Sequence, residues 1–236
     1  MIRVTFLAHS GFLVELEGVN LLFDWWKGDL PPVPEGKPLA VFASHRHPDH
    51  FDPRIFALDG DNTRFLLGKG IRLTERNRDR WGLGEAAAAR CRVLSGGETA
   101  EPFPGVAAET LSSTDEGVAF LVTAEGQTIF HAGDLNWWHW EGEDLAWNRN
   151  MEVNFQHYAE PLRGRRIDLA MLPLDPRLGA DGFLGPRYFL ELADIRCFLP
   201  MHQWEDFNFT DTFLARYPQF QDRTVPVRRQ GQVFQL

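Results

Sequence analysis

The sequence has 236 residues, of which 44% are hydrophobic and 24% charged, and its formal net charge is −9. This length supports one sizeable core and predicts a single domain over residues 1–236. The acidic balance argues against a nucleic-acid partner, because such binding draws on phosphate neutralisation by Lys and Arg. No stretch approaches the roughly twenty apolar residues of a membrane span, and the N-terminus lacks a signal-peptide pattern. We therefore expect a cytoplasmic protein.

The first part of the chain is typical of β-structure broken by turns. Strands are expected at residues 2–7, 12–16, 19–24 and 39–44. Ser10-Gly11 predicts a hairpin between the first two of them. Asp52 followed by Pro53 predicts a helix start, with Asp as the cap and Pro at the first helical position. Residues 60–105 are expected to hold short strands and loops.

The second part alternates strands with longer helical stretches. Strands are expected at residues 105–111, 117–126, 127–134, 167–174, 196–202 and within 225–236, and helices at 135–165 and 185–195. Glu125-Gly126 predicts a tight turn between two of the strands. Strands in two groups, each followed by helices, indicate an α+β fold, specifically a four-layer αββα sandwich.

The segment His45-Arg46-His47-Pro48-Asp49-His50 is the strongest chemical signal. Three imidazoles and a carboxylate within six residues are the usual ligands of zinc, manganese or iron. If the chain is extended here, His45 and His47 point to the same side and can share one metal. Asp49 and His50 follow where the chain turns, and can reach a second metal.

HRHPDH resembles the H-x-H-x-D-H signature of the metallo-β-lactamase superfamily. The segment LLFDWW is similar to an early strand motif of the family, and IFHAGDLN and FLPMHQW are similar to later ones. LAHSGFLVE resembles the opening hairpin of the branch that includes ascorbate-phosphate lactonases. The resemblance implies that Asp24 supports the metal loop, that Asp134 bridges two metals and that His202 binds the second one. It also implies that His9 faces the site.

One departure from the family pattern concerns the third His of the first metal site. The corresponding region reads LSSTDEGVAFLV, where Thr114 takes the expected position and Asp115 is its neighbour. Either Asp115 binds the metal, water completes the site, or the first site is empty and the protein holds one metal. We expect a filled but altered site with Asp115 as a ligand. His131 and His139 are further imidazoles that could substitute.

The metal cluster predicts a hydrolase that uses one or two divalent ions, with zinc expected first and manganese or iron as alternatives. Metal-held hydroxide would attack a small ester, lactone or phosphodiester, and Asp49 would orient the water and move a proton. Trp137, Trp138 and Trp140 read equally well as a pocket wall or as helix packing. Arg177 could meet an anionic substrate group or pair with a nearby acid.

The sequence gives weaker support to three other functions. A nuclease of the same superfamily conflicts with the acidic charge and the missing nucleic-acid module. A di-iron flavin system would need a flavodoxin-like segment, which the sequence lacks. A non-catalytic metal- or ligand-binding protein on the same fold is the main alternative, because the first metal site departs from the family pattern.

Overall fold

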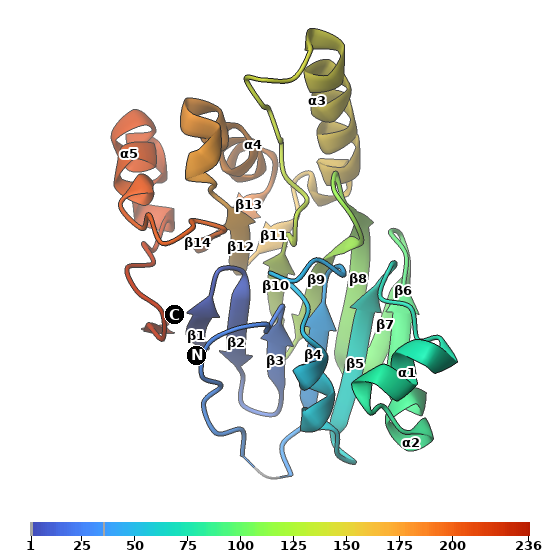
Figure 1. Ribbon diagram of the computed structural model, residues 1–236. Helices are drawn as coiled ribbons and strands as arrows, with labels where there is room; N and C mark the ends of the chain where they lie inside the picture. The colour runs from blue at the N-terminus through green and yellow to red at the C-terminus, as the bar shows by residue number, and fades with distance from the viewer. Residues whose placement is uncertain (1, 35) are drawn as a thin grey trace.

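The computed structural model describes residues 2–34 and 36–236, which form two β-sheets packed face to face between two helical layers (Figure 1). The first sheet has the strand order β15 (Val233–Gln235), β1 (Arg3–Ala8), β2 (Gly11–Glu15), β3 (Asn20–Phe23), β4 (Leu39–Ala43), β5 (Thr63–Gly68), β6 (Cys91–Leu94). The second has the order β14 (Phe198–Met201), β12 (Leu169–Pro173), β10 (Gln127–His131), β9 (Val118–Ala124), β8 (Val106–Ser112), β7 (Thr99–Phe103). A small third sheet pairs β11 (Arg166–Ile167) with β13 (Asp194–Ile195).

Helices cover the outer face of each sheet. The α-helices are α1 (Glu75–Trp81), α2 (Glu85–Ala89), α3 (Leu145–Ala159), α4 (Leu184–Leu192) and α5 (Phe209–Arg216). The 3₁₀ helices are η1 (Pro53–Leu58), η2 (Glu160–Leu162), η3 (Pro176–Phe183) and η4 (Pro218–Arg223). None of the helices in residues 2–34 and 36–236 is long and apolar enough to cross a bilayer.

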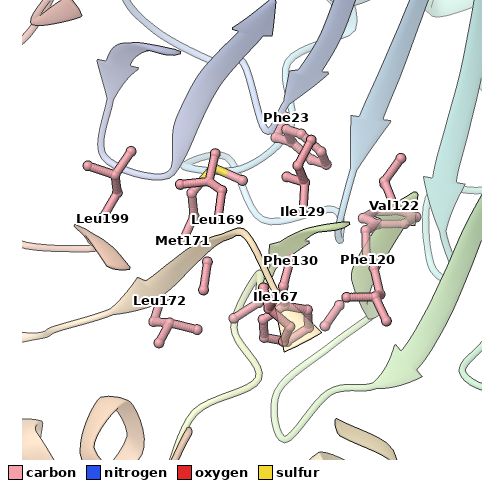
Figure 2. Close-up of a cluster of buried hydrophobic side chains, with 14 of the residues drawn as sticks. Phe23, Phe120, Val122, Ile129, Phe130, Ile167, Leu169, Met171, Leu172 and Leu199 are labelled. Carbon is pink, nitrogen blue, oxygen red and sulfur yellow. The ribbon is translucent and has the colours of Figure 1, made fainter. Parts of the chain in front are cut away.

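The alternation of side chains along each strand explains the layers. On β4, Phe42 faces the second sheet and meets Phe120 with ring centroids 5.1 Å apart, whereas Val41 packs outward with the cluster under η1, α1 and α2. Figure 2 shows the consecutive residues Ile129 and Phe130 of β10 directed to opposite sides. Phe130 meets Phe189 of α4 at 5.5 Å. The expected α+β fold and αββα sandwich are confirmed.

Several element predictions need correction. Only Leu145–Ala159 of the expected 135–165 helix is α-helical, because residues 132–144 instead follow the edge of the two sheets with side-chain hydrogen bonds. Residues 60–105 contain α1 and α2, which we did not expect. Thr74 caps α1 by accepting the Asn77 N–H, and Gly82, with φ 64°, ends it. In the tail, only Val233–Gln235 forms a strand.

The carboxyl ends of parallel strands from both sheets meet at one edge of the sandwich. β3 and β4 run parallel in the first sheet, and β10, β12 and β14 run parallel in the second. Polar residues that follow these strands are therefore brought together, which is where ligand sites form in sheets of this kind.

Candidate metal centre

Most residues of the candidate site lie just after the carboxyl end of a strand. They are Asp24 after β3, Ser44 and His45 after β4, Asp134 after β10, Asp175 after β12 and His202 after β14. His9 lies in the turn between β1 and β2. Each strand thus carries its polar residue to the shared edge while its apolar residues remain in the core.

Two glycines allow the close approach of these segments. A Cβ atom on Gly117 would lie 2.0 Å from the Ser44 carbonyl oxygen, and one on Gly133 would lie 2.7 Å from the Ser44 Cβ. Both glycines also have positive φ, 70° and 51°. Any larger residue at either position would push Ser44, and His45 with it, away from Asp134.

One group of side chains, which we call the first cluster, consists of His45, His47, Asp115 and Asp134. His45 Nε2 lies 3.1 Å from His47 Nδ1 and 3.5 Å from Asp134 Oδ2. His47 Nδ1 lies 3.3 Å from Asp115 Oδ2. The structure therefore brings Asp115, the residue expected to replace the third His, into this cluster.

A second group, the second cluster, consists of His9, Asp49, His50 and His202. His9 Nε2 lies 3.4 Å from Asp49 Oδ2. His50 Nε2 and His202 Nε2 lie 3.2 and 3.5 Å from Asp134 Oδ1. Asp134 therefore directs one carboxylate oxygen to each cluster, which is the arrangement of a carboxylate that bridges two cations.

The donor atoms fit divalent metal ions. Three buried polar atoms, His9 Nε2, His50 Nε2 and Asp134 Oδ1, have no hydrogen-bond partner within residues 2–34 and 36–236. Their distances of 3.2–3.5 Å to neighbouring donors match the separation of about 3.4 Å expected for two ligands on one tetrahedral ion. Buried polar atoms without partners are costly, and a cation at each cluster would satisfy them.

Hydrogen bonds behind the imidazoles leave their Nε2 atoms free for the clusters. His50 Nδ1 lies 2.7 Å from Asp24 Oδ2, and His202 Nδ1 lies 2.9 Å from Asp175 Oδ2. His45 Nδ1 lies 2.9 Å from Ser44 Oγ, which itself donates to Asp24. A bond at Nδ1 fixes the tautomer in which Nε2 carries the lone pair that a metal needs.

The charge states of His9, His45 and Asp134 suit metal binding. Burial lowers the pKa of His9 and of His45 to about 4, so both rings are neutral near pH 7. Burial alone would raise the pKa of Asp134, but the neighbouring His50 and His202 outweigh it and hold the pKa well below its usual value. An ionised carboxylate and neutral imidazoles are the forms that bind cations.

Three of the expected site residues have other roles in the structure. His131 uses both nitrogens: Nε2 bonds the Ser10 carbonyl at 2.8 Å, and Nδ1 accepts the Gly133 N–H at 3.1 Å. His139 Nδ1 pairs with Asp181 at 2.8 Å and joins neither cluster. Thr114 Oγ1 donates to the Asn136 carbonyl at 2.7 Å, so it holds the turn after Asp134.

A pocket of about 360 Å³ opens over the clusters. Its lining includes the metal-site residues His47, Asp49, Asp115, Asp134 and His202. The rest of the lining contains Thr114, Trp138, Trp140, Trp147, Met151, Arg177 and Trp204. Trp138 and Trp140 therefore form a pocket wall, whereas Trp137 packs on Phe155 with ring centroids 5.9 Å apart.

Sequence reasoning missed the roles of Ser44 and Asp175. Asp175 is fully buried, and hydrogen bonds from His202 and Arg177 outweigh its burial and lower its pKa to about 2. Its signal was present in the sequence, because LPLD ends a buried strand with an Asp just as LLFD does at Asp24. Ser44 had no comparable signal, since its role depends on contacts across the two sheets.

Comparison with known families gives a direct match. Residues 3–139 match the model of the beta-lactamase superfamily domain. The chain belongs to this family. The matched residues include Gly117 and Gly133, which pack against Ser44, and every candidate ligand except His202. His202 comes from the second half of the chain.

Relatives of this beta-lactamase superfamily protein carry consistent names. A UPF0173 metal-dependent hydrolase of Opitutus terrae is 29% identical over 230 residues, covering 85% of this chain and 84% of its own. A protein of the same name from Heliobacterium modesticaldum is 28% identical, covering 86% and 82%. The structure of Igni18, a metallo hydrolase of Ignicoccus hospitalis, has a TM-score of 0.63 at 18% identity, covering 100% and 99%. This last likeness shows the fold.

Proposed function

We propose that this protein is a metal-dependent hydrolase that cleaves a small ester, lactone or phosphodiester, as in the ascorbate-phosphate-lactonase branch. The observation that carries the proposal is Asp134, whose two oxygens face two separate His/Asp clusters. The names of the relatives support the same activity. The pocket of about 360 Å³ over these clusters suits a small molecule rather than a polymer.

The residues that would hold the ions are His45, His47, Asp115 and Asp134 at the first cluster, and Asp49, His50, His202, His9 and Asp134 at the second. Divalent ions there would lower the pKa of water and polarise a substrate oxygen. Mixed nitrogen and oxygen donors are typical of zinc, and the carboxylate of Asp115 also permits manganese or iron.

Asp49 is the protein group that we assign to proton movement. It lines the pocket and lies 3.4 Å from His9 Nε2. Burial would raise its pKa, but the nearby imidazoles of His9 and His50 outweigh this and hold the pKa well below its usual range. The ionised carboxylate can accept a hydrogen bond from the attacking water, orient it and take its proton at a carboxylate oxygen.

We also propose a cytoplasmic location, where such an enzyme acts on a soluble metabolite. Cys91 and Cys197 are free and half-buried. Unpaired thiols are typical of reducing compartments. Burial raises the pKa of the two thiols to about 12 and about 11, which keeps them protonated and unreactive at neutral pH.

Metal analysis together with turnover tests the proposal. Protein purified without chelator is expected to contain two ions per chain, and Asp115→Ala one. The surface variant Asp61→Ala, whose side chain is fully exposed, is the matched control and should keep both. The wild type should hydrolyse 4-nitrophenyl acetate, bis(4-nitrophenyl) phosphate or a γ-lactone, lose this activity to a chelator and regain it with zinc, manganese or iron.

The other outcomes are equally informative. Two ions without turnover of any of these substrates would favour the alternative, a non-catalytic binding protein on the same fold. A protein that neither contains nor takes up any of the three metals would overturn the hydrolase proposal. An unchanged metal content in Asp115→Ala would remove Asp115 from the site.

A further inference from the structure

Arg177 lines the same pocket as the metal-site residues, with part of its guanidinium already engaged. Its Nε and Nη2 donate to the carboxylate of Asp175 at 3.0 and 2.6 Å. Within the described residues, Nη1 has no hydrogen-bond partner. The side chain is 45% exposed although Asp175 is fully buried. The guanidinium is therefore anchored on one edge and open on another.

Two tryptophans lie close to this guanidinium. The Arg177 Cζ lies 4.5 Å from the Trp204 ring centroid and 5.5 Å from that of Trp140. Arginine interacts with aromatic faces in this way and retains donors in a rigid fork. A cation that is packed beside two rings and hydrogen-bonded on one edge loses little entropy on binding a ligand, so its free edge is a preorganised anion-binding group.

Arg177 differs in charge from the other residues that line the pocket. It is the only Lys or Arg among the described residues that line this pocket. The lining residues Trp138, Trp147 and Met151 are apolar or aromatic, and the rest of the lining includes imidazoles and carboxylates of the metal centre. A ligand that fills the pocket thus meets metal-site residues, aromatic rings and one cation.

We infer that the pocket selects substrates that carry an anionic oxygen group, a carboxylate or a phosphate, on an apolar or aromatic body, and that Arg177 is the residue that determines this specificity. The body packs on Trp138, Trp140 and Trp147, and the anion accepts hydrogen bonds from Arg177 Nη1. This inference names the substrate class of the proposed hydrolase and so rests on that proposal. Its test measures binding rather than turnover, so the two can fail separately.

The experiment uses the metal-loaded protein and three probes of similar shape: phenylacetate, its neutral analogue phenylacetamide, and phenylphosphonate. Dissociation constants come from tryptophan fluorescence and calorimetry. Phenylacetate should bind at least about tenfold more tightly than phenylacetamide, as expected for one charge-assisted hydrogen bond pair in a partly buried site. Phenylphosphonate distinguishes the two anion types, and tighter binding of it than of phenylacetate would assign a phosphate.

Variants separate Arg177 from the metals, which could also bind a carboxylate. Arg177→Met should reduce the preference for phenylacetate over phenylacetamide to below about threefold at the same metal content. Arg177→Lys keeps the charge but loses the fork and the stacking, and should give an intermediate preference. Arg163→Met removes an exposed arginine paired with Glu160 and should leave the preference unchanged.

Two results would overturn the inference. One is equal binding of phenylacetate and phenylacetamide by the wild type. The other is a preference that persists in Arg177→Met, which would place the anion on the metals. If Arg177→Met does not fold because Asp175 loses its partner, Arg177→Lys decides: an unchanged preference there, with unchanged metal content, contradicts recognition by the guanidinium fork.

Discussion

The two clusters of the candidate metal centre differ in burial and in support. In the second cluster, His50 and His202 are buried and their Nδ1 atoms bond the buried carboxylates of Asp24 and Asp175. In the first cluster, the side chains of His47 and Asp115 are each 39% exposed and come from turns rather than strand ends. Only His45 of that cluster has comparable support, from Ser44.

This difference indicates that the second cluster is preorganised for an ion, whereas the first cluster can adapt its side chains. Ligands fixed by buried hydrogen bonds lose little freedom when an ion binds, whereas exposed side chains must be ordered. We therefore expect stepwise metal binding, with the second cluster filled at a lower metal concentration than the first. The first cluster is also where this chain departs from the family pattern that the resemblance of the sequence implies.

Replacing the residue shared by both clusters should have the largest effect. Asp134→Asn removes the negative charge between the two sites while keeping the side-chain size. We expect at most one ion per chain and a loss of hydrolytic rate of at least about 1000-fold, measured by elemental analysis and turnover. Retention of two tightly bound ions would show that Asp134 does not bridge. It would also contradict the description of two clusters that share this carboxylate.

Removing the support of one cluster should affect that cluster alone. Asp175→Asn removes the charged partner of His202 Nδ1, and should weaken metal binding at the second cluster by about 10- to 100-fold. Competition with a chromophoric chelator measures it. Asp168→Asn is the matched control, because Asp168 bonds Thr128 and Arg166 away from the site. Equal losses in both variants would attribute the effect to general destabilisation.

The pH dependence of binding should come mainly from the second cluster. Burial alone would lower the pKa of His50, but the carboxylates of Asp134 and Asp24 outweigh it and raise the pKa well above its usual value. His50 therefore holds a proton in the metal-free protein, and an ion must displace it. Affinity for zinc should fall by about tenfold per unit as pH is lowered through neutrality. A titration at pH 6, 7 and 8 that showed no change would contradict this.

The exposed pair beside the first cluster should have the smallest effect. Arg46 Nε and Nη2 each lie 2.6 Å from a Glu116 oxygen, with 61% of the Arg46 side chain exposed. Solvent and salt screen such a pair. Arg46→Met should therefore change the affinity of the first cluster by less than about threefold in a metal titration at low salt. A tenfold change would indicate that this pair orders the turn of His47.

The sequence predicted most of the scaffold and of the ligand candidates because both depend on local patterns. Apolar runs that end in Asp or His mark strand ends, and parallel strands bring their ends together. Asp115 was the expected replacement for the missing His, and the structure places it 3.3 Å from His47. Its binding of a metal stays a prediction until the ions are counted.

What the sequence could not predict depends on contacts between distant segments. His131 was a further imidazole that could substitute in the site, yet its nitrogens are used by the Ser10 carbonyl, 121 positions away in the chain, and by the nearby Gly133 N–H. Arg177 had two equal interpretations, and the structure shows that it pairs with Asp175 and still leaves Nη1 open. Residues 135–144 were predicted as helix because the side-chain hydrogen bonds that hold this loop leave no trace in the periodicity of the sequence.

Three residues of the metal centre have left-handed backbone conformations, His9, Asp24 and His202, with φ of 54°, 43° and 62°. Such conformations cost about 1 kcal/mol or more each in residues other than glycine. The function of the site therefore opposes the stability of the fold, because residues that serve the metal centre are held in costly backbone conformations. A bound ion restores that balance, since it stabilises only the folded state. Thermal stability should thus report metal occupancy directly. Selection for stability alone would first replace the residues of the metal centre at this edge of the two sheets.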